Sequence, residues 1–300
     1  MDRERSGTER RGEAWRNVAC LTLAVALAPL WSCSGDLSPQ SLVERFRILA
    51  VRADVPEPSP GDTVTLDALV ADPDGAGRAV SYLWVACVLG PSRDPQACAD
   101  PSGGGIIGVG FAATFSFVAP ALADGETDAQ VLLTFSGCAG GTFTLPMDGG
   151  TPSGAPECAG GDAATAYKRV VVSAATERNH NPSLATLSLD GESWVDGPAV
   201  TRTACVEGST CTPLEIGATL GPGSAEEWTE IVFGSPQVRT EEVFVSWFAT
   251  GGSFERIRSG GEDPKVKFTP PKEPGTIDLW FVVHDGRGGT DWTSRQMVFE

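Results

Sequence analysis

The chain has 300 residues, a formal net charge of −17 and a hydrophobic content of 41%, which is enough for about two domains with cores of their own. Thirty-six glycines, 22 prolines and only 20% charged residues indicate many turns between short strands rather than long helices. So acidic a surface is repelled by nucleic acid, which excludes nucleic-acid binding.

Residues 1–32 predict an export signal rather than part of the fold. Five arginines precede the apolar run from Val18 to Trp31, which has 14 residues. This run is too short to span a bilayer and has the length of a signal-peptide core. A buried helix is the alternative, but the preceding positive charge and Pro29 within the run argue against it.

The apolar run ends in Leu-Trp-Ser-Cys at residues 30–33, which resembles a bacterial lipobox. The resemblance implies cleavage before Cys33 and attachment of diacylglycerol to its sulfur, so that residues 33–44 become a lipidated tether. Ser34 after the cysteine resembles the sorting signal for the outer membrane. Because more than one acyl chain holds such a cysteine, the protein is expected to stay on the membrane. Removal of residues 1–32 changes the net charge from −17 to −18.

Alternation of apolar and polar residues predicts a first β domain over residues 45–174. Residues 45–53 form the first expected strand, and residues 63–71 form the second, in which every other residue is apolar. An Asp-Pro-Asp-Gly turn at residues 72–75 leads into a third strand at residues 80–86. These short strands and regular turns are typical of a sandwich.

The second half of the chain repeats the plan of the first. A linker at residues 175–183 separates the first domain from a second one at residues 184–300, in which residues 211–220 and 243–249 take the places of the second and third strands. Four landmarks recur in the same order: Trp84 with Trp247, residues 117–120 with 268–271, residues 129–137 with 277–286, and residues 168–172 with 295–299.

This pattern resembles the immunoglobulin-like sandwich repeats of bacterial surface proteins, in the PKD and cadherin-like group. The shared features include the Pro-Gly-Asp-Thr-Val-Thr-Leu segment at residues 60–66, a central Trp and a closing Val-x-Asp-Gly-x-Gly-Gly hairpin. The residues after each Trp differ from the Phe-Gly-Asp-Gly turn of PKD domains. The overall composition also resembles that of predicted myxobacterial lipoproteins. We therefore expect an all-β fold, with two tandem immunoglobulin-like antiparallel β-sandwich domains after a cleaved lipoprotein signal peptide.

Six cysteines lie in the exported part of the chain, and their compartment favours three disulfides. They are Cys87, Cys98, Cys138, Cys158, Cys205 and Cys211. Zinc is the alternative, but the chain has no Cys-x-x-Cys motif, and its two histidines are remote from these cysteines.

The topology of such a sandwich restricts the disulfide pairing. The strands that lead to Cys87 and Cys138 run antiparallel, so their ends lie at opposite poles, beyond the Cα distance of about 7 Å that a disulfide tolerates. We therefore expect the local pairs Cys87–Cys98, Cys138–Cys158 and Cys205–Cys211. The first two would close the long loops of the first domain, where we expect specific contacts with a ligand.

The segment Val-Val-His-Asp-Gly-Arg-Gly-Gly at residues 282–289 places one of the two histidines beside an aspartate. A catalytic pair would need a nucleophile and an orienting group that converge in a pocket, and no such motif accompanies His284 and Asp285. Alternation along residues 277–283 puts His284 on the face opposite the core, and the glycines suit a turn between strands. We interpret the segment as the last hairpin of the second domain.

The sequence predicts no cofactor. Calcium is the one metal for which it offers candidate oxygen ligands. Candidate oxygen ligands occur in the turn after the second strand and in the linker: Asp72, Asp74, Glu177, Asn179 and Asn181. The linker is similar to the asparagine-rich segments that bind calcium between cadherin repeats, and such hard cations need about six oxygens. The two aspartates suit a turn equally well, and a histidine stands in the linker where an acid would be expected.

These features predict a non-enzymatic, lipid-anchored protein of the outer membrane that binds or adheres to an envelope protein or a polysaccharide. The alternative is an accessory structural subunit of an outer-membrane complex. A glycan-cleaving enzyme is a further alternative, which would need two convergent carboxylates in a groove. The pairs Glu226–Glu227 and Glu241–Glu242 are interpreted as solvated surface instead.

Overall fold

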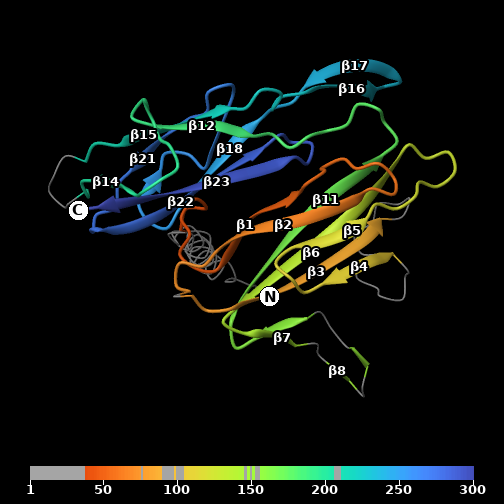
Figure 1. Ribbon diagram of the computed structural model, residues 1–300, viewed down its shortest axis with the longest axis horizontal. Coiled ribbons are helices and arrows are strands. Elements are labelled where there is room, and N and C mark those ends of the chain that lie inside the picture. Colours follow the sequence, from red (N-terminus) through yellow and green to blue (C-terminus); the bar gives the residue numbers. More distant parts are fainter. Residues whose placement is uncertain are drawn as a thin grey trace, which may run out of the picture. The chain divides into compact units, whose positions relative to one another are not determined.

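The computed structural model describes residues 38–75, 77–89, 98, 105–144, 147–148, 151–152, 156–205 and 211–300. Its strands all lie within one compact unit, Gln40–Glu300. The described residues form 23 strands and no α-helix, which confirms the all-β fold (Figure 1). In the described part of the chain, no helix is long and apolar enough to cross a membrane. The signal segment and Cys33 lie outside the described residues.

Two antiparallel sheets form the first sandwich. One has the strand order β1-β2-β5, with β1 at Arg47–Ala53, β2 at Thr63–Ala71 and β5 at Phe115–Val118. The other has the order β11-β6-β3-β4, with β3 at Val80–Leu89, β4 at Ile106–Gly110, β6 at Asp128–Ala139 and β11 at Asp162–Ser173.

Two further sheets form the second sandwich. One has the order β13-β12-β15-β21-β19, with β12 at Leu184–Leu189, β13 at Glu192–Ser193, β15 at Leu214–Leu220, β19 at Ser253–Phe254 and β21 at Lys265–Thr269. The other has the order β14-β23-β22-β18-β20, with β14 at Val200–Arg202, β18 at Phe244–Ala249, β20 at Arg258–Gly260, β22 at Gly275–His284 and β23 at Thr290–Phe299. The order β12-β15-β21 repeats β1-β2-β5, and β23-β22-β18-β20 repeats β11-β6-β3-β4, as the sequence landmarks predict.

Each sandwich buries a tryptophan at the same place. Trp84 on β3 lies opposite Phe135 on β6, and Trp247 on β18 lies opposite Phe281 on β22. The ring centroids of these pairs are 4.1 and 5.6 Å apart. All four side chains are almost completely buried. Large aromatic side chains contribute strongly to core stability, so both tryptophans are core residues as expected.

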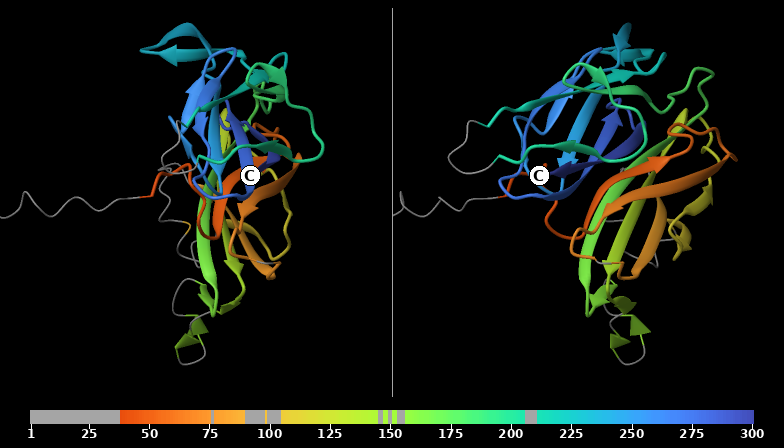
Figure 2. Two further views of the ribbon diagram at one scale, coloured as in Figure 1. Left: turned by 90° about the vertical axis from the view of Figure 1, so that its left-hand side faces the viewer. Right: turned by 60° about the vertical axis from the view of Figure 1, so that its left-hand side comes forward.

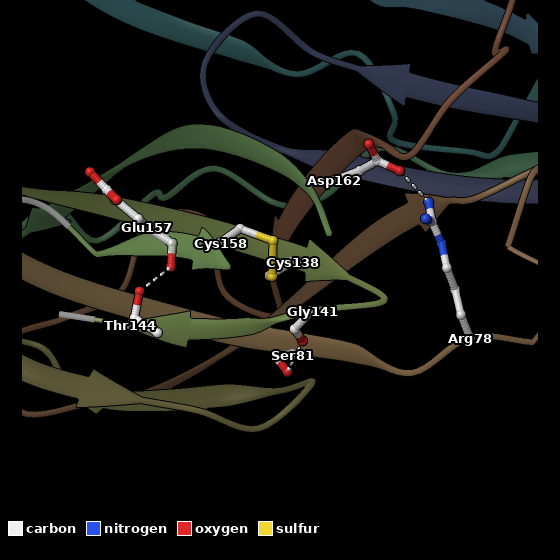
Figure 3. Close-up of a disulfide and its surroundings, with 8 residues drawn as sticks. All are labelled: Arg78, Ser81, Cys138, Gly141, Thr144, Glu157, Cys158 and Asp162. Carbon is white, nitrogen blue, oxygen red and sulfur yellow. Dashed lines mark hydrogen bonds and ion pairs between the residues drawn. A yellow bond between two sulfur atoms is a disulfide. The ribbon is translucent and has the colours of Figure 1, made fainter. Parts of the chain in front are cut away.

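Three disulfides lie in the first and second sandwiches, and all three close local loops. They are Cys87–Cys98, Cys138–Cys158 and Cys205–Cys211, with Cα atoms 5.8, 5.4 and 5.2 Å apart. In the β3–β6 ladder, Cys87 lies opposite Leu132 and Cys138 lies opposite Ser81. These two cysteines are therefore near opposite ends of the ladder. Figure 3 shows the disulfide that joins β6 to β10 (Glu157–Ala159) beside the ion pair of Arg78 and Asp162.

Strand β22 buries side chains on both of its faces. Phe281 and Val283 belong to the second core, whereas Val282 points the other way, is 0% exposed and belongs to neither core. The first sandwich covers this second face, because Arg52 of β1 stacks on Trp292, the residue that pairs with Val282. The two sandwiches therefore meet at β1 and β23.

A segment before β1 contacts both sandwiches; we call residues 41–46 the strap. The backbone N–H of Val43 donates to Ala249 O at 2.9 Å, and that of Ala249 donates to Ser41 O at 3.0 Å. The ring of Phe46 packs on Gly137 of β6. A Cβ atom added at Gly137 would lie 2.6 Å from that ring. Ser41, Val43 and Phe46 are buried, so the end of the expected tether is packed into the fold.

The structure also contains short two-stranded sheets that the sequence did not predict. The largest is the hairpin of β16 (Glu227–Val232) and β17 (Ser235–Thr240), which stands clear of the sandwich sheets (Figure 2). The others pair β7 (Thr142–Thr144) with β10, and β8 (Met147–Asp148) with β9 (Thr151–Pro152).

Candidate functional site

The loop between β22 and β23 is organised by one buried carboxylate. Asp285 is 2% exposed and accepts backbone N–H groups from Arg287 at 2.7 Å, Gly288 at 2.9 Å and Gly289 at 2.9 Å. Hydrogen bonds to an ionised acceptor are stronger than neutral ones. Gly286 and Gly288 have φ values of 80° and 122°, which other residues rarely adopt. The expected hairpin is present, and Asp285 fixes its loop.

The same loop holds the linker. Asn179 donates from Nδ2 to Asp285 Oδ2 at 2.9 Å. Asn181 donates from Nδ2 to Ala53 O at 2.7 Å, and its Oδ1 accepts the backbone N–H of Thr290 at 2.9 Å. Ala53 belongs to the first sandwich and Thr290 to the second, so the Asn181 side chain joins the two sandwiches, while the Asn179 side chain holds the linker to the second.

Arg287 connects the loop to the root of the β16–β17 hairpin. Its guanidinium bonds Glu241 Oε1 at 2.9 Å and Glu57 Oε2 at 3.0 Å, and it stacks on Trp228 with 5.1 Å to the ring. The Glu241 side chain is 1% exposed, and its other oxygen accepts the backbone N–H of Glu226 at 3.0 Å. Burial raises the pKa of Glu241, since a carboxylate loses its hydration there. The interpretation of Glu241 as solvated surface is therefore wrong.

A polar cluster lies under the loop between the two sandwiches. Lys168 of β11 donates to Gly288 O and lies 3.3 Å from Thr290 Oγ1, which is also 3.3 Å from His284 Nδ1. Burial lowers the pKa of Lys168 to about 8 and that of His284 to about 4. His284 does lie on the face opposite the second core, but that face is covered, and its ring stacks on Phe244.

An open cleft of about 920 Å³ lies between the linker and the root of the β16–β17 hairpin. Its walls include Trp228 and Arg287, and His180, whose Nδ1 lies 2.7 Å from Glu226 Oε1. Carboxylates outnumber arginines in these walls: Glu57, Glu177, Glu226 and Glu227 face Arg178 and Arg287. The cleft is therefore an acidic surface, and its Arg287 is already ion-paired with Glu57 and Glu241.

The five residues expected to bind calcium do not come together. Asp72 lies at the end of β2 away from the linker and accepts two hydrogen bonds from Arg78, at 2.8 and 2.7 Å, while Asp74 is exposed. Asn179 and Asn181 use their amides in the bonds described above, and Glu177 is exposed in the cleft. Within the described ranges, no group of three or more His, Cys, Asp or Glu side chains could hold a metal ion.

Sequence reasoning missed Lys168, Glu57 and Glu241 as members of this site. Glu57 and Arg287 are 230 positions apart, so no local spacing could reveal their pairing. The role of Asp285 had a local signal, since an aspartate that precedes a glycine-rich turn often accepts the backbone N–H groups of that turn.

No protein-family model matches the chain. No curated protein matches it either. Among solved structures, the chain is similar to the D0–D1 domain of intimin, with 10% identity over 84% of this chain and 99% of that one and a TM-score of 0.24. It is also similar to the Yersinia pseudotuberculosis adhesin InvE, with 11% identity over 84% of this chain and 58% of that one and a TM-score of 0.23. A structure titled BspA_C_WT matches with 8% identity over 83% of this chain and 99% of that one and a TM-score of 0.21. Because these TM-scores are low, the fold class rests on the sheets themselves.

Proposed function

We propose that the chain is a non-catalytic binding protein of the cell envelope, held at the outer membrane by a lipid on Cys33. The observation that carries the binding role is the loop at residues 285–289, which joins both sandwiches, the linker and the root of the β16–β17 hairpin. Surface segments on a scaffold fixed in this way lose little conformational entropy on binding, so they are suited to recognition.

The environment of Thr290 supports a non-catalytic role. A hydroxyl between a histidine and a lysine of lowered pKa could serve as a nucleophile beside its base. Thr290, however, is 3% exposed and lies under the loop, so a substrate cannot reach its oxygen. In the cleft, Arg287 is shared between Glu57 and Glu241, and these ion pairs reduce its capacity to stabilise charge on a substrate.

The lipobox-like segment supports the membrane anchor. Only six residues separate Cys33 from Gln40, the start of the compact unit. Six extended residues reach roughly 20 Å, so a lipid on Cys33 would hold the strap close to the bilayer surface. The binding surfaces would then stay near the membrane.

Two measurements test the proposal separately. Metabolic labelling with a fatty acid should mark the wild-type chain and the Ser34→Ala control, whereas Cys33→Ala should be unlabelled and released from membranes. Continued membrane attachment of Cys33→Ala would show that the lipid anchor is wrong. Crosslinking of intact cells should join the wild-type chain to a defined envelope protein or polysaccharide, and Glu227→Lys in the cleft should weaken that product. Crosslinked products that are unchanged by Glu227→Lys and by other substitutions in the cleft would contradict the binding role of this surface.

A further inference from the structure

The tip of the β16–β17 hairpin carries a large apolar side chain that the fold does not use. Phe233 is 103% exposed, and Val238 on the same hairpin is 69% exposed. All side chains of β17 are exposed, and the hairpin forms a sheet of its own, so no sandwich strand pairs with it (Figure 2). An exposed aromatic residue at a protruding tip is the kind of anchor that dominates the affinity of many interfaces.

The backbone at this tip is one that phenylalanine disfavours. Val232 pairs with Ser235, and the two residues between them, Phe233 and Gly234, have φ values of 50° and 78°. Positive φ at both positions defines a type I′ turn, which favours asparagine or aspartate followed by glycine. A bulky residue at the first position is strained, because its Cβ atom crowds the following carbonyl.

The chain itself contains the favoured form of the same turn. Asp190 and Gly191 join β12 to β13 with φ values of 53° and 84°, and they have the Asp-Gly sequence that such a turn prefers. At that turn the aspartate also accepts the backbone N–H of Glu215, as expected for a structural role. Phe233 therefore occupies a position that, for the fold alone, aspartate or asparagine would fill better.

The hairpin presents Phe233 from a fixed root. A two-stranded hairpin alone is marginally stable in water. Here the backbone N–H of Glu241 bonds Glu226 O at 2.9 Å, and Trp228 at the start of β16 stacks under Arg287 of the β22–β23 loop. The tip is therefore held in a defined direction before any partner binds, which lowers the entropic cost of docking.

We propose that the β16–β17 hairpin is a docking element that inserts Phe233 into an apolar pocket rimmed by basic residues on a partner protein. This proposal rests on the binding role proposed above and goes beyond it by naming the contact. Glu230, midway along β16, lies 3.3 Å from Arg239 on β17, and the net charge of −17 on the whole chain favours a basic partner surface. A net charge of −17 opposes insertion into an anionic bilayer. Pro236 lacks an N–H group, which opposes the addition of a partner strand along β17.

Photo-crosslinking in cells tests the contact. The full chain would carry p-benzoylphenylalanine in place of Phe233, and the crosslinked peptide would be identified by mass spectrometry. We expect one partner protein, with the crosslink at a single site of apolar residues flanked by Lys or Arg. The affinity of the full chain for that purified partner should fall at least tenfold in Phe233→Asn and should be unchanged in Asp190→Asn. Because asparagine suits the turn, Phe233→Asn should also raise the melting temperature by about 2 °C, so lost binding cannot be assigned to unfolding.

Three outcomes would overturn the proposal. They are unchanged partner affinity in Phe233→Asn, a crosslink from position 233 only to a second copy of the chain, or flotation with vesicles of phosphatidylethanolamine and phosphatidylglycerol that depends on Phe233. If crosslinkers in the cleft recover an envelope partner while position 233 does not, this inference fails and the proposed function stands. If neither position yields a partner, the proposed function fails as well.

Discussion

Asn179 in the linker donates a 2.9 Å hydrogen bond to the carboxylate of Asp285 in the second sandwich, and both side chains are at most 3% exposed. The same carboxylate accepts three backbone N–H groups of its own loop. The next residues of that loop bond Lys168 of the first sandwich and Glu241 at the root of the hairpin. One buried carboxylate thus fixes the positions of three separate parts of the chain.

Replacement of Asp285 by alanine should destabilise the protein strongly. The substitution leaves Asn179 and several backbone N–H groups buried without an acceptor, and the expected loss is about 3 kcal/mol of unfolding free energy. Urea denaturation measures it. Asp291→Ala is the matched control, because Asp291 pairs with Arg52 and is 29% exposed, so its loss should be below about 1 kcal/mol. Equal losses in the two variants would contradict the role of Asp285.

Gly289 should tolerate no side chain. A Cβ atom there would lie 2.0 Å from Asp285 Oδ2 and 2.7 Å from His180 O. Gly289→Ala must therefore displace either the buried carboxylate or the linker, and we expect a loss of about 2 kcal/mol or more in thermal or chemical unfolding. Gly197→Ala is the control, since nothing lies within 4 Å of the added Cβ atom. A Gly289→Ala variant as stable as this control would show that the loop is not tightly packed.

His284 should make the fold sensitive to acid. Burial lowers its pKa to about 4 in the folded protein, so between that pH and its ordinary value of 6.5 the unfolded chain binds a proton that the folded chain does not. Stability is complete above pH 6.5 and falls as the pH falls towards 4, by up to about 3 kcal/mol. The unfolding free energy of His284→Gln should lack this part of the decline. Identical slopes for the two proteins would refute the assignment.

Lys168 should make the stability of the fold depend on pH in the alkaline range. Burial lowers its pKa to about 8, so from there to 10.5 the unfolded chain holds a proton that the folded chain has released. The stability of the wild type should therefore rise with pH across this window relative to Lys168→Met. Denaturation at a series of pH values gives the difference. A difference that stays constant from pH 7 to 10.5 would mean that Lys168 is not desolvated.

The repeated sandwich plan could be predicted from the sequence because it depends on local alternation and on landmarks such as Trp84 and Trp247. The contact between the sandwiches also had a local signal, since Leu279 to Val283 is an unbroken apolar run, as expected for a strand buried on both faces. The partners of Arg287 could not be predicted, because Glu57 and Glu241 approach it only in the folded chain. The β16–β17 hairpin was missed because its exposed strands show no alternation towards a core.

We expect the β22–β23 loop to couple the two sandwiches into one cooperative unit. Native-state hydrogen exchange of the wild type and Asp285→Ala measures this coupling, since β6 and β22 report on the two sandwiches separately. We expect the substitution to accelerate exchange in β6 of the first sandwich by the same factor as in β22 of the second. Acceleration confined to β22, with β6 protected as in the wild type, would contradict it.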